Sequence, residues 1–487
     1  MTLQQDEQRK EMVLYAIFLW MVVFLLNPLV LLVTPDKVSA EEGKEQTGPF
    51  DFILIDEATI NKFVKEIKEG FDYLLKVQTY GSAQKIFNDS ILNPNNDFLK
   101  IPQYTANLEL RPDFSLNYWR LKLNIKPRLH AYWQGWDKAE GSYQGKSHHV
   151  QGYVNEYGAS LKLAENLFVS YGQENLQWGP SFLISPSNPF FRDTGRSNPK
   201  QEVPGMDFAR FVWLYNPSFT ISFIANVDKG RQMFSQPFPF EPTYALKFDY
   251  TTKRKYFSVI ASYQQNNEDW PVPNDRMSLG SYAGWTVSDA LLLYGEGTVT
   301  IGTNVLYPEK RELGPGAGSI IVLSPKKADS SIPTGTLLVG GSYTFKFGST
   351  VALEYVFNSP GYTKDQAELY FQLYEQVTPF YLNYGPQVQN IAAQILTVSL
   401  NTGLRLLRQN YLMFQFVHPQ LWDVLTITSR IVYNIDDRSY MLSPVIEYNL
   451  WKHFGIFLIG GHNFGPKQSE FRSIVGYSWM AGLEYTF

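Results

Sequence analysis

The last thirteen residues of the chain alternate strictly between two kinds of side chain. One set is apolar or aromatic, namely Val475, Tyr477, Trp479, Ala481, Leu483, Tyr485 and Phe487, and the residues between them are small or polar. A period of two predicts a β-strand with one apolar face. Aromatic residues towards both ends of that face are typical of a strand that crosses an outer membrane, where aromatic girdles mark the two interfaces. The pattern therefore predicts a transmembrane antiparallel β-barrel.

Composition supports a barrel over a bundle of membrane helices. Mean hydropathy is −0.22, which excludes a helical bundle, yet aromatic residues make up 16% of the chain. A barrel reconciles the two values because half of each strand is polar while Tyr and Trp gather at the interfaces. A large soluble β-protein is the alternative class. The net charge of −4 argues against a nucleic-acid partner, and the absence of cysteine excludes disulfides and thiolate metal sites.

The first forty residues have the pattern of a secretory signal peptide. Arg9 and Lys10 precede an apolar run over residues 13–33, and the small residues at 38–40 suit cleavage after Ala40. Because the run is long for a signal peptide, an uncleaved membrane span is the alternative. We expect residues 1–40 to be removed and the mature protein to lie in the bacterial cell outer membrane.

Residues 41–102 have a different periodicity and predict a small N-terminal helical segment. Apolar side chains recur there at helical spacing, at Ile60, Phe63, Val64, Ile67, Phe71 and Leu74. Asp56 can cap this helix, and residues 82–91 can form a second, shorter one. We interpret the segment as a periplasmic segment or a plug, which either gates the pore or only caps the open end of the barrel.

Residues 103–487 are predicted to form the transmembrane barrel. From Asn117 onward, short turns alternate with longer loops, as expected for the two ends of an outer-membrane barrel. Counting from a strand at 117–135 gives about sixteen strands, an even number that places the C-terminus at the short-turn end. Residues 104–110 are either left out or paired with an undetected strand, to make about eighteen. The loop at 358–400 is long enough to hide that strand, and a short amphipathic helix is expected there over 366–376. The predicted fold is all-β.

Residues 119–134 place apolar and basic side chains on opposite faces of one strand. The basic face carries Arg120, Lys122, Lys126, Arg128 and His130, and Arg430 faces the same way on a later strand. A Lys or Arg on the lipid side of the midplane costs roughly 2–4 kcal/mol, so this face is expected to line the lumen. A cationic ladder would favour anionic solutes. The alternative is that carboxylates on neighbouring strands, such as Glu156, Glu174 and Asp249, neutralise it.

The loop at 178–206 is stiffened by prolines and carries aromatic and cationic side chains. Its candidate constriction or ligand residues are Trp178, Phe190, Phe191, Arg192, Arg196 and Lys200. The Trp-Gly step at 178–179 and the Ser-Pro-x-Asn-Pro-Phe run at 185–190 resemble a group of bacterial outer-membrane barrels that includes the capsule-assembly lectins and related porin-like proteins. The resemblance implies either diffusion of small solutes or binding of a surface polysaccharide. The loop either folds into the pore and narrows it or forms a rigid outer loop.

The sequence gives little evidence of catalysis, and an enzyme whose site residues lie far apart in the sequence is a third alternative. None of the six histidines stands in an HExxH pattern, and no G-x-S-x-G elbow occurs. We therefore expect no enzyme, no catalytic residues, no metal site and no cofactor. The predicted function is a porin-like channel for passive diffusion of small solutes. The channel would prefer anions if neighbouring carboxylates do not neutralise the cationic ladder. The alternative is a barrel that binds or anchors surface polysaccharide.

The expected partners follow from the same reading. Phe487 at the end of an amphipathic strand resembles the closing strand of bacterial outer-membrane proteins, which implies recognition by their assembly machinery. Outer-membrane lipid would surround the barrel, and a small solute or a polysaccharide would occupy it. The sequence leaves the oligomeric state open.

Overall fold

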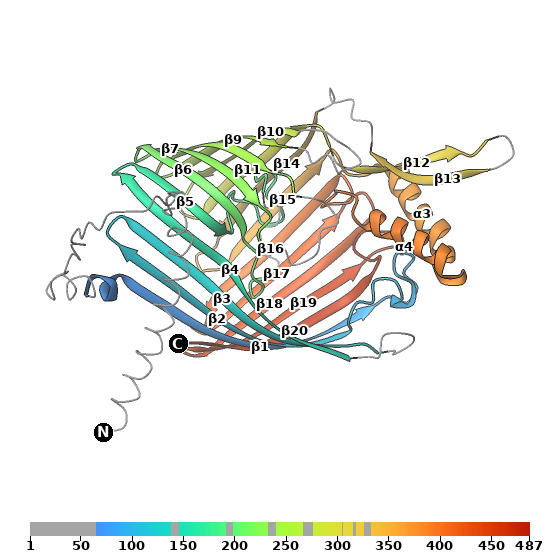
Figure 1. Cartoon of the computed structure of the whole chain (residues 1–487), viewed down its shortest axis with the longest axis horizontal. Helices are drawn as coiled ribbons and strands as arrows, with labels where there is room; N and C mark the ends of the chain where they lie inside the picture. Colours follow the sequence, from blue (N-terminus) through green and yellow to red (C-terminus); the bar gives the residue numbers. More distant parts are fainter. Residues whose placement is uncertain are drawn as a thin grey trace, which may run out of the picture. The chain divides into compact units, whose positions relative to one another are not determined.

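The barrel is a single antiparallel sheet that closes on itself. The computed structural model describes residues 65–137, 146–190, 198–231, 240–265, 276–303, 305–314, 318–325 and 333–487. Within these ranges, an 18-stranded sheet runs in sequence order around the barrel, and its first strand, β1, pairs with its last, β20 (Figure 1). The expected signal peptide lies outside the described residues.

The strands of the barrel are joined alternately at its two ends. In order they are β1 (Phe71–Ile86), β2 (Tyr104–Tyr118), β3 (Leu121–Gly135), β4 (Lys146–Ala164), β5 (Leu167–Glu174), β6 (Met206–Asn216), β7 (Phe219–Asp228), β8 (Thr243–Thr251), β9 (Lys255–Gln264), β10 (Arg276–Thr286), β11 (Leu291–Ile301), β14 (Thr334–Thr344), β15 (Thr350–Asn358), β16 (Asn410–Leu421), β17 (Leu425–Asn434), β18 (Ser439–Trp451), β19 (Phe454–Phe464) and β20 (Val475–Thr486). Tight turns such as 119–120 and 452–453 make one end, which we call the short-turn end, and the longer connections make the long-loop end.

The outer surface of the barrel is apolar and its inner surface is polar. On β20, Trp479 and Leu483 are each 40% exposed, as the sequence pattern predicts. On β2, Leu108 is 53% exposed while its neighbour Glu109 is 7% exposed, because successive side chains point to opposite faces of the sheet. An exposed apolar surface of this extent is characteristic of a protein whose outside faces lipid.

The expected count of sixteen strands is wrong, and the two further strands are β1 and β2. The helical interpretation fails for Phe71 and Leu74 and for residues 82–86, all of which lie in β1; only residues 65–70 of the described chain before β1 are helical. The outward face of β1 carries small residues such as Gly81 and Ala83, so its alternation is weak. Hydrogen bonding to β2 and β20 on both sides overrides the local helical spacing.

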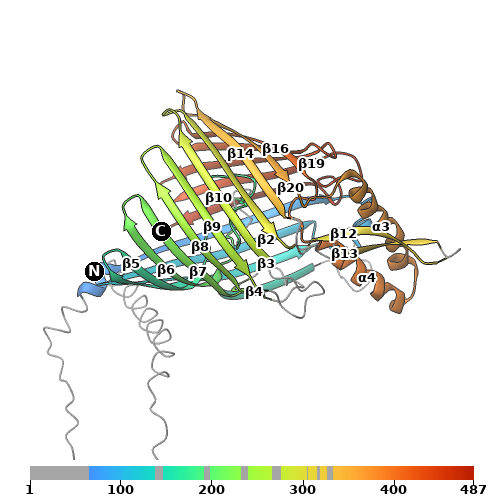
Figure 2. The same cartoon turned by 90° about the horizontal axis from the view of Figure 1, so that it is seen from above.

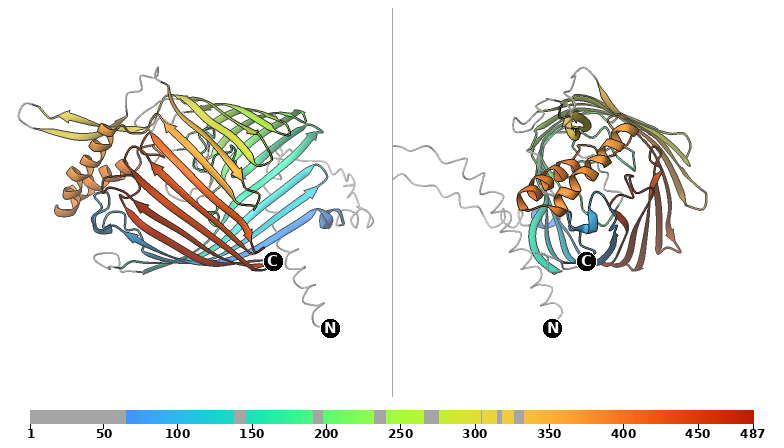
Figure 3. Two further views of the ribbon diagram at one scale, coloured as in Figure 1. Left: turned by 180° about the vertical axis from the view of Figure 1, so that it is seen from behind. Right: turned by 90° about the vertical axis from the view of Figure 1, so that its right-hand side faces the viewer.

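A helical cap lies at the long-loop end. It contains α3 (Lys364–Asn383) and α4 (Pro386–Leu400), where the sequence analysis expected a short helix and allowed for a hidden strand. The right-hand view of Figure 3 shows both helices lying across this end of the barrel. The β1–β2 connection, which contains the 3-10 turn η1 (Pro94–Asn96), is bound to α3 through Thr378 Oγ1, which donates to the carbonyl of Ile91 at 3.2 Å.

The cap has its own apolar core and an attached hairpin. The buried core residues include Leu92, Tyr307, Tyr362, Phe371, Tyr374 and Leu396. The hairpin is formed by β12 (Leu306–Glu312) and β13 (Ser319–Pro325), and Figure 2 shows it extending beyond the barrel beside α3 and α4. Among the described helices, none combines the length and apolar composition needed to cross a membrane.

Candidate functional site

The basic residues predicted on β3 face the interior of the barrel, with one exception. Lys122, Lys126, Arg128 and His130 line interior cavities or form buried contacts there, and Arg128 is 4% exposed. Arg120 lies instead in the exposed 119–120 turn and donates to the carbonyl of Leu163 at 3.2 Å. The alternation of residues 119–134 places it on the basic face, but the chain turns before β3 begins.

Arg430 is also interior, but it belongs to a different part of the wall. It lies on β17, is 6% exposed, and donates to Oε1 of Gln415 on β16 at 2.6 Å. The sheet places β17 several strands away from β3. The structure therefore does not unite Arg430 with the β3 cations in one ladder.

Most interior cations near β3 are paired with carboxylates. Lys126 Nζ lies 2.8 Å from Glu156 Oε2, and Arg128 NH2 lies 2.8 Å from Asp113 and 2.6 Å from Glu202. The other carboxylates proposed from the sequence are paired too: Glu174 binds Arg210, and Asp249 binds Lys247. A buried charge is stable only when it is paired and hydrogen-bonded, which accounts for these carboxylates on the inner wall.

The described residues of the connection between β5 and β6, which are 175–190 and 198–205, lie inside the barrel, and we call them the inserted segment. The right-hand view of Figure 3 shows this connection within the ring of strands. Glu296 on β11 holds its first part, accepting hydrogen bonds from the hydroxyls of Ser181 at 2.5 Å, Ser185 at 2.6 Å and Ser187 at 2.7 Å. Glu354 on β15 accepts hydrogen bonds from the backbone N–H groups of residues 182 and 183, at 2.6 and 3.0 Å.

Apolar packing adds to these polar anchors. Phe190 lies edge-on to Phe208 with ring centroids 4.9 Å apart, and Trp178 lies edge-on to Phe190 at 5.9 Å. The rings of Trp178 and Phe190 pack against a buried cluster on the inner wall, which consists of Phe208, Ile224, Ala245 and Ile260. Edge-to-face rings in a dry cluster fix the position of this part of the segment.

The second part of the inserted segment contacts one part of the inner wall, from β18 and β20 to β2 and β3, which are near neighbours in the closed sheet. Lys200 Nζ lies 2.8 Å from Glu447 and 3.5 Å from Glu484, while its carbonyl accepts from Arg111 at 2.9 Å. Glu202 accepts both Nε and NH2 of Arg128, at 2.7 and 2.6 Å. The pKa of Glu202 is lowered, because the hydrogen bonds and charge of Arg128 outweigh the burial that would raise it. Phe191, Arg192 and Arg196 lie outside the described residues.

Two large cavities flank this layer of ion pairs. The long-loop cavity, of about 540 Å³, is lined by residues of β1 to β4 and by residues 198, 200, 201 and 202 of the inserted segment. The short-turn cavity, of about 780 Å³, is lined by Lys122, Lys126, Glu156 and other residues of the same wall. The two cavities share no lining residue. The Arg128–Glu202 pair lies between them, because Glu109 and Arg111 line the long-loop cavity and Asp113 lines the short-turn cavity.

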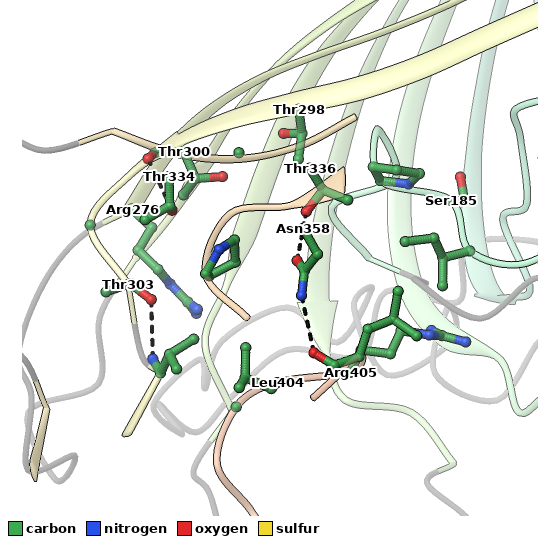
Figure 4. A pocket seen from close by; sticks show the side chains of 18 residues that line it. Ser185, Arg276, Thr298, Thr300, Thr303, Thr334, Thr336, Asn358, Leu404 and Arg405 are labelled. Atoms are coloured by element: carbon green, nitrogen blue, oxygen red, sulfur yellow. Dashed lines mark hydrogen bonds between the residues drawn. The ribbon is translucent and has the colours of Figure 1, made fainter. Parts of the chain in front are cut away.

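A third, smaller cavity of about 90 Å³ lies under the cap, between the inserted segment and the strands β10, β11 and β14. Figure 4 shows the hydroxyls of Thr298, Thr300, Thr334 and Thr336 at its wall. Arg276 also lines it and is paired with Glu241. This cavity is too small for more than a few water molecules or a small ion.

The acidic residues that hold the inserted segment, Glu296 and Glu354, are not among the residues predicted from the sequence. Glu296 is a single carboxylate between two glycines on β11, 2% exposed, and Glu354 is fully buried. A charged residue at an inward position of a small-residue strand is the signal that could have drawn attention to Glu296. Its serine partners lie more than a hundred positions earlier in the chain, so spacing alone could not reveal the pairing.

Comparison with known proteins gives fold likenesses only. No protein-family model and no curated protein sequence matches the chain. Among solved structures, it is similar to Pseudomonas aeruginosa OccK5 with 10% identity and a TM-score of 0.49, covering 86% of this chain and 98% of that one. The chain is also similar to Acinetobacter baumannii OccAB2, with 8% identity and a TM-score of 0.49, covering 86% of this chain and 98% of that one. A third similar structure is a variant of the Rhodopseudomonas blastica porin, with 9% identity and a TM-score of 0.39, covering 86% of this chain and 100% of that one.

Proposed function

We propose that the protein is an outer-membrane channel for passive diffusion of small polar solutes. The observation that carries the proposal is a closed barrel with an apolar outside and with large polar cavities on both sides of an internal layer of ion pairs. Barrels of sixteen or more strands leave room for an aqueous channel. The cleaved signal peptide, the surrounding outer-membrane lipid and recognition of the closing strand by the assembly machinery belong to the same proposal.

In this proposal the inserted segment forms the constriction. Lys200 and Glu202 are held to one part of the wall by Arg111, Arg128, Glu447 and Glu484. Each of these contacts joins the segment to a different strand, so the segment cannot be withdrawn without breaking several charge-assisted hydrogen bonds. Solute would pass beside this layer from one cavity to the other.

Selectivity for charge is expected to be weak. The long-loop cavity is lined by three cations, Arg111, Lys200 and Arg231, and by two carboxylates, Glu109 and Glu202. The short-turn cavity is lined by three cations and four carboxylates. Because the excess charge is small and of opposite sign in the two cavities, we propose a modest preference at most for anions.

Binding or anchoring of a surface polysaccharide is the second candidate. The observation that favours it is the cap, because α3 and α4 lie across the long-loop end, as they would in a barrel that is closed to passage. The two candidates differ in conductance. An anchoring barrel would be electrically silent and would retain glycan at the cell surface.

The test is single-channel recording of the full-length mature protein in a planar lipid bilayer. A channel gives unitary current steps whose size rises with salt concentration, together with a reversal potential near zero in a salt gradient. Absence of current steps from protein shown to be folded and inserted would refute the channel. A large reversal potential of either sign would refute the proposed charge balance.

A further inference from the structure

The geometry points to the long-loop cavity as a binding site for an uncharged saccharide, held at the point where the channel narrows. The inference deepens the proposed function, because it names the class of solute that the channel would take. It rests on the shape, the lining and the charge balance of the long-loop cavity.

The size of the cavity suits a sugar. Its volume of about 540 Å³ falls within the roughly 300–1,000 Å³ typical of small-molecule sites. Only Met480 among its lining residues is an aliphatic or thioether side chain. An apolar solute would therefore find no complementary surface, whereas a polyhydroxylated one would.

Side-chain amides are the most frequent polar groups of the lining. Asn107, Gln134, Gln151, Asn198 and Gln201 all contribute to it. An amide both donates and accepts, as does a sugar hydroxyl, so a wall of amides can satisfy neighbouring hydroxyls in either orientation. Three of these amides are already oriented: Gln134 accepts from Ser147 at 3.2 Å, Asn107 contacts His130 at 2.9 Å, and Asn198 accepts from the backbone N–H of residue 200 at 3.1 Å.

Aromatic rings border the amides. The rings of His130, Tyr132 and His149 form a row across β3 and β4 with centroids 5.0 and 5.1 Å apart. Of these three rings, His130 and Tyr132 line the cavity, as do Tyr80 and Tyr153. The Tyr80 hydroxyl donates to Glu109 at 2.7 Å. The negative face of an aromatic ring attracts the weakly positive C–H groups of a sugar ring, and the ordered rings cost little entropy on binding.

The charge balance favours an uncharged ligand over an acidic one. Arg111 is paired with Glu109, Lys200 with Glu447 and Glu484, and Glu202 with Arg128. Arg231 donates to Asn155 at 2.9 Å and lies 3.2 Å from the centroid of the Tyr153 ring. Among the described residues, no carboxylate lies within ion-pair distance of Arg231, so it alone could attract an acidic sugar. The test therefore includes one.

The experiment is calorimetric titration of the full-length mature protein with maltotriose and with glucuronate, in a detergent that has no sugar headgroup. We expect maltotriose to bind with a Kd of about 1 mM, because a solute in passage must be released as easily as it is captured. Glucuronate should bind more weakly. No heat with maltotriose, or tighter binding of glucuronate than of maltotriose, would overturn the inference.

Two substitutions locate the site. Tyr132→Leu and Gln151→Ala should each raise the Kd for maltotriose about three- to tenfold, the effect of losing one good contact. Tyr250→Leu is the matched control, because Tyr250 lies on the outer face of β8 and is 47% exposed; its Kd should be unchanged. Gel mobility with and without heating shows whether each variant is a folded barrel. Folded Tyr132 and Gln151 variants with unaltered Kd would overturn the assignment to this cavity.

The titration and the bilayer recording separate the two proposals. Current steps without maltotriose binding would support the channel and refute the saccharide site. Maltotriose binding to a barrel that carries no current would refute the channel and support the saccharide site. Where both hold, maltotriose should block the current in wild-type protein at concentrations near its Kd, and the Tyr132→Leu variant should need several-fold more.

Discussion

Single carboxylates hold the inserted segment inside the barrel. Glu296 accepts four hydrogen bonds from residues 181, 185 and 187, and the backbone N–H of residue 187 is the fourth donor at 3.1 Å. No other part of the segment depends on so many donors converging on one group. Residues 181–187 are therefore the part whose position is most sensitive to one substitution.

Glu296→Ala tests this anchor. We expect the substitution to remove the acceptor that three hydroxyls and one amide share, at about 1–3 kcal/mol for each donor left unsatisfied, and to release this part of the segment from the wall. The Ser185 hydroxyl keeps the carbonyl of residue 178 as an acceptor at 3.0 Å. Single-channel recording should show a larger conductance and more open-channel noise than in wild type. Glu165→Ala, at an exposed position in the 165–166 turn, is the control. Wild-type conductance and noise in Glu296→Ala would show that the anchor is dispensable.

Glu202→Gln tests the ion-pair layer. The substitution leaves Arg128 with Asp113 as its carboxylate partner and adds one positive charge at the proposed constriction. A unit charge about 4 Å from a passing ion contributes about 1 kcal/mol in water-like surroundings, so the permeability ratio should shift towards anions by up to about fivefold. The reversal potential in a salt gradient measures the shift. A shift towards cations would contradict the proposed path, and Glu165→Gln should cause none.

At the residue level, the sequence was informative about direction but not about partners. The alternation around 119–134 correctly predicts that Lys122, Lys126 and Arg128 face inward, because period two is a local property. It also suggested the neutralising role of Glu156. The pairing of Arg128 with Glu202 could not be predicted, since it depends on how a long loop folds back into the barrel.

At the level of elements, predictability followed how strongly each strand alternates. β20, with large side chains on its outer face, is readily predicted. β1 has Gly81 and Ala83 on that face, so its local spacing predicts a helix where the structure has a strand. The helix α3 begins with a capping box in which Thr363 and Gln366 bond each other reciprocally, and the helix expected over 366–376 lies within it. The packing of this helix on the β1–β2 connection could not be derived from the sequence.

Three connections at the long-loop end meet at one partly buried carboxyl group, that of Glu470 in the β19–β20 connection. Its oxygens accept from the backbone N–H of Leu407 at 2.9 Å, from the hydroxyl of Tyr411 at 2.5 Å and from the amide of Asn434 at 2.8 Å. Its own N–H donates to Asp437 at 2.8 Å. Burial raises the pKa of Glu470 to about 7 from its ordinary value of 4.5.

The raised pKa predicts that these connections are held more firmly in acid. For a carboxyl group whose pKa is raised on folding, the stabilisation is fully present below the unfolded value of 4.5 and is lost as pH rises through about 7. Hydrogen exchange at the Leu407 amide, corrected for its intrinsic pH dependence, should be slower at pH 5 than at pH 8. Glu470→Gln should abolish the difference. Faster corrected exchange at pH 5 in the wild-type protein would contradict this assignment.

At the scale of the whole molecule, the structure reverses the arrangement of a soluble protein. Large apolar side chains such as Leu279 and Met277 are 59% and 60% exposed on the outside, while Arg128 and Glu354 are buried within. This arrangement is stable only if hydrocarbon covers the outer surface and water reaches the inner cavities. The channel and the saccharide site both depend on it.

Spin-label accessibility along β10 tests this arrangement most directly. The chain has no cysteine, so single cysteines at positions 277–286, apart from Gly280 and Gly284, can each carry a label without further substitution. A Cβ atom at these two glycines would lie 3.0 Å from Ser187 and 2.1 Å from Tyr256. In lipid bilayers, labels at odd positions should collide preferentially with dissolved oxygen and labels at even positions with a water-soluble nickel complex, in strict alternation. Uniform protection from the nickel complex, or oxygen contact at the even positions, would contradict a barrel with water inside and lipid outside.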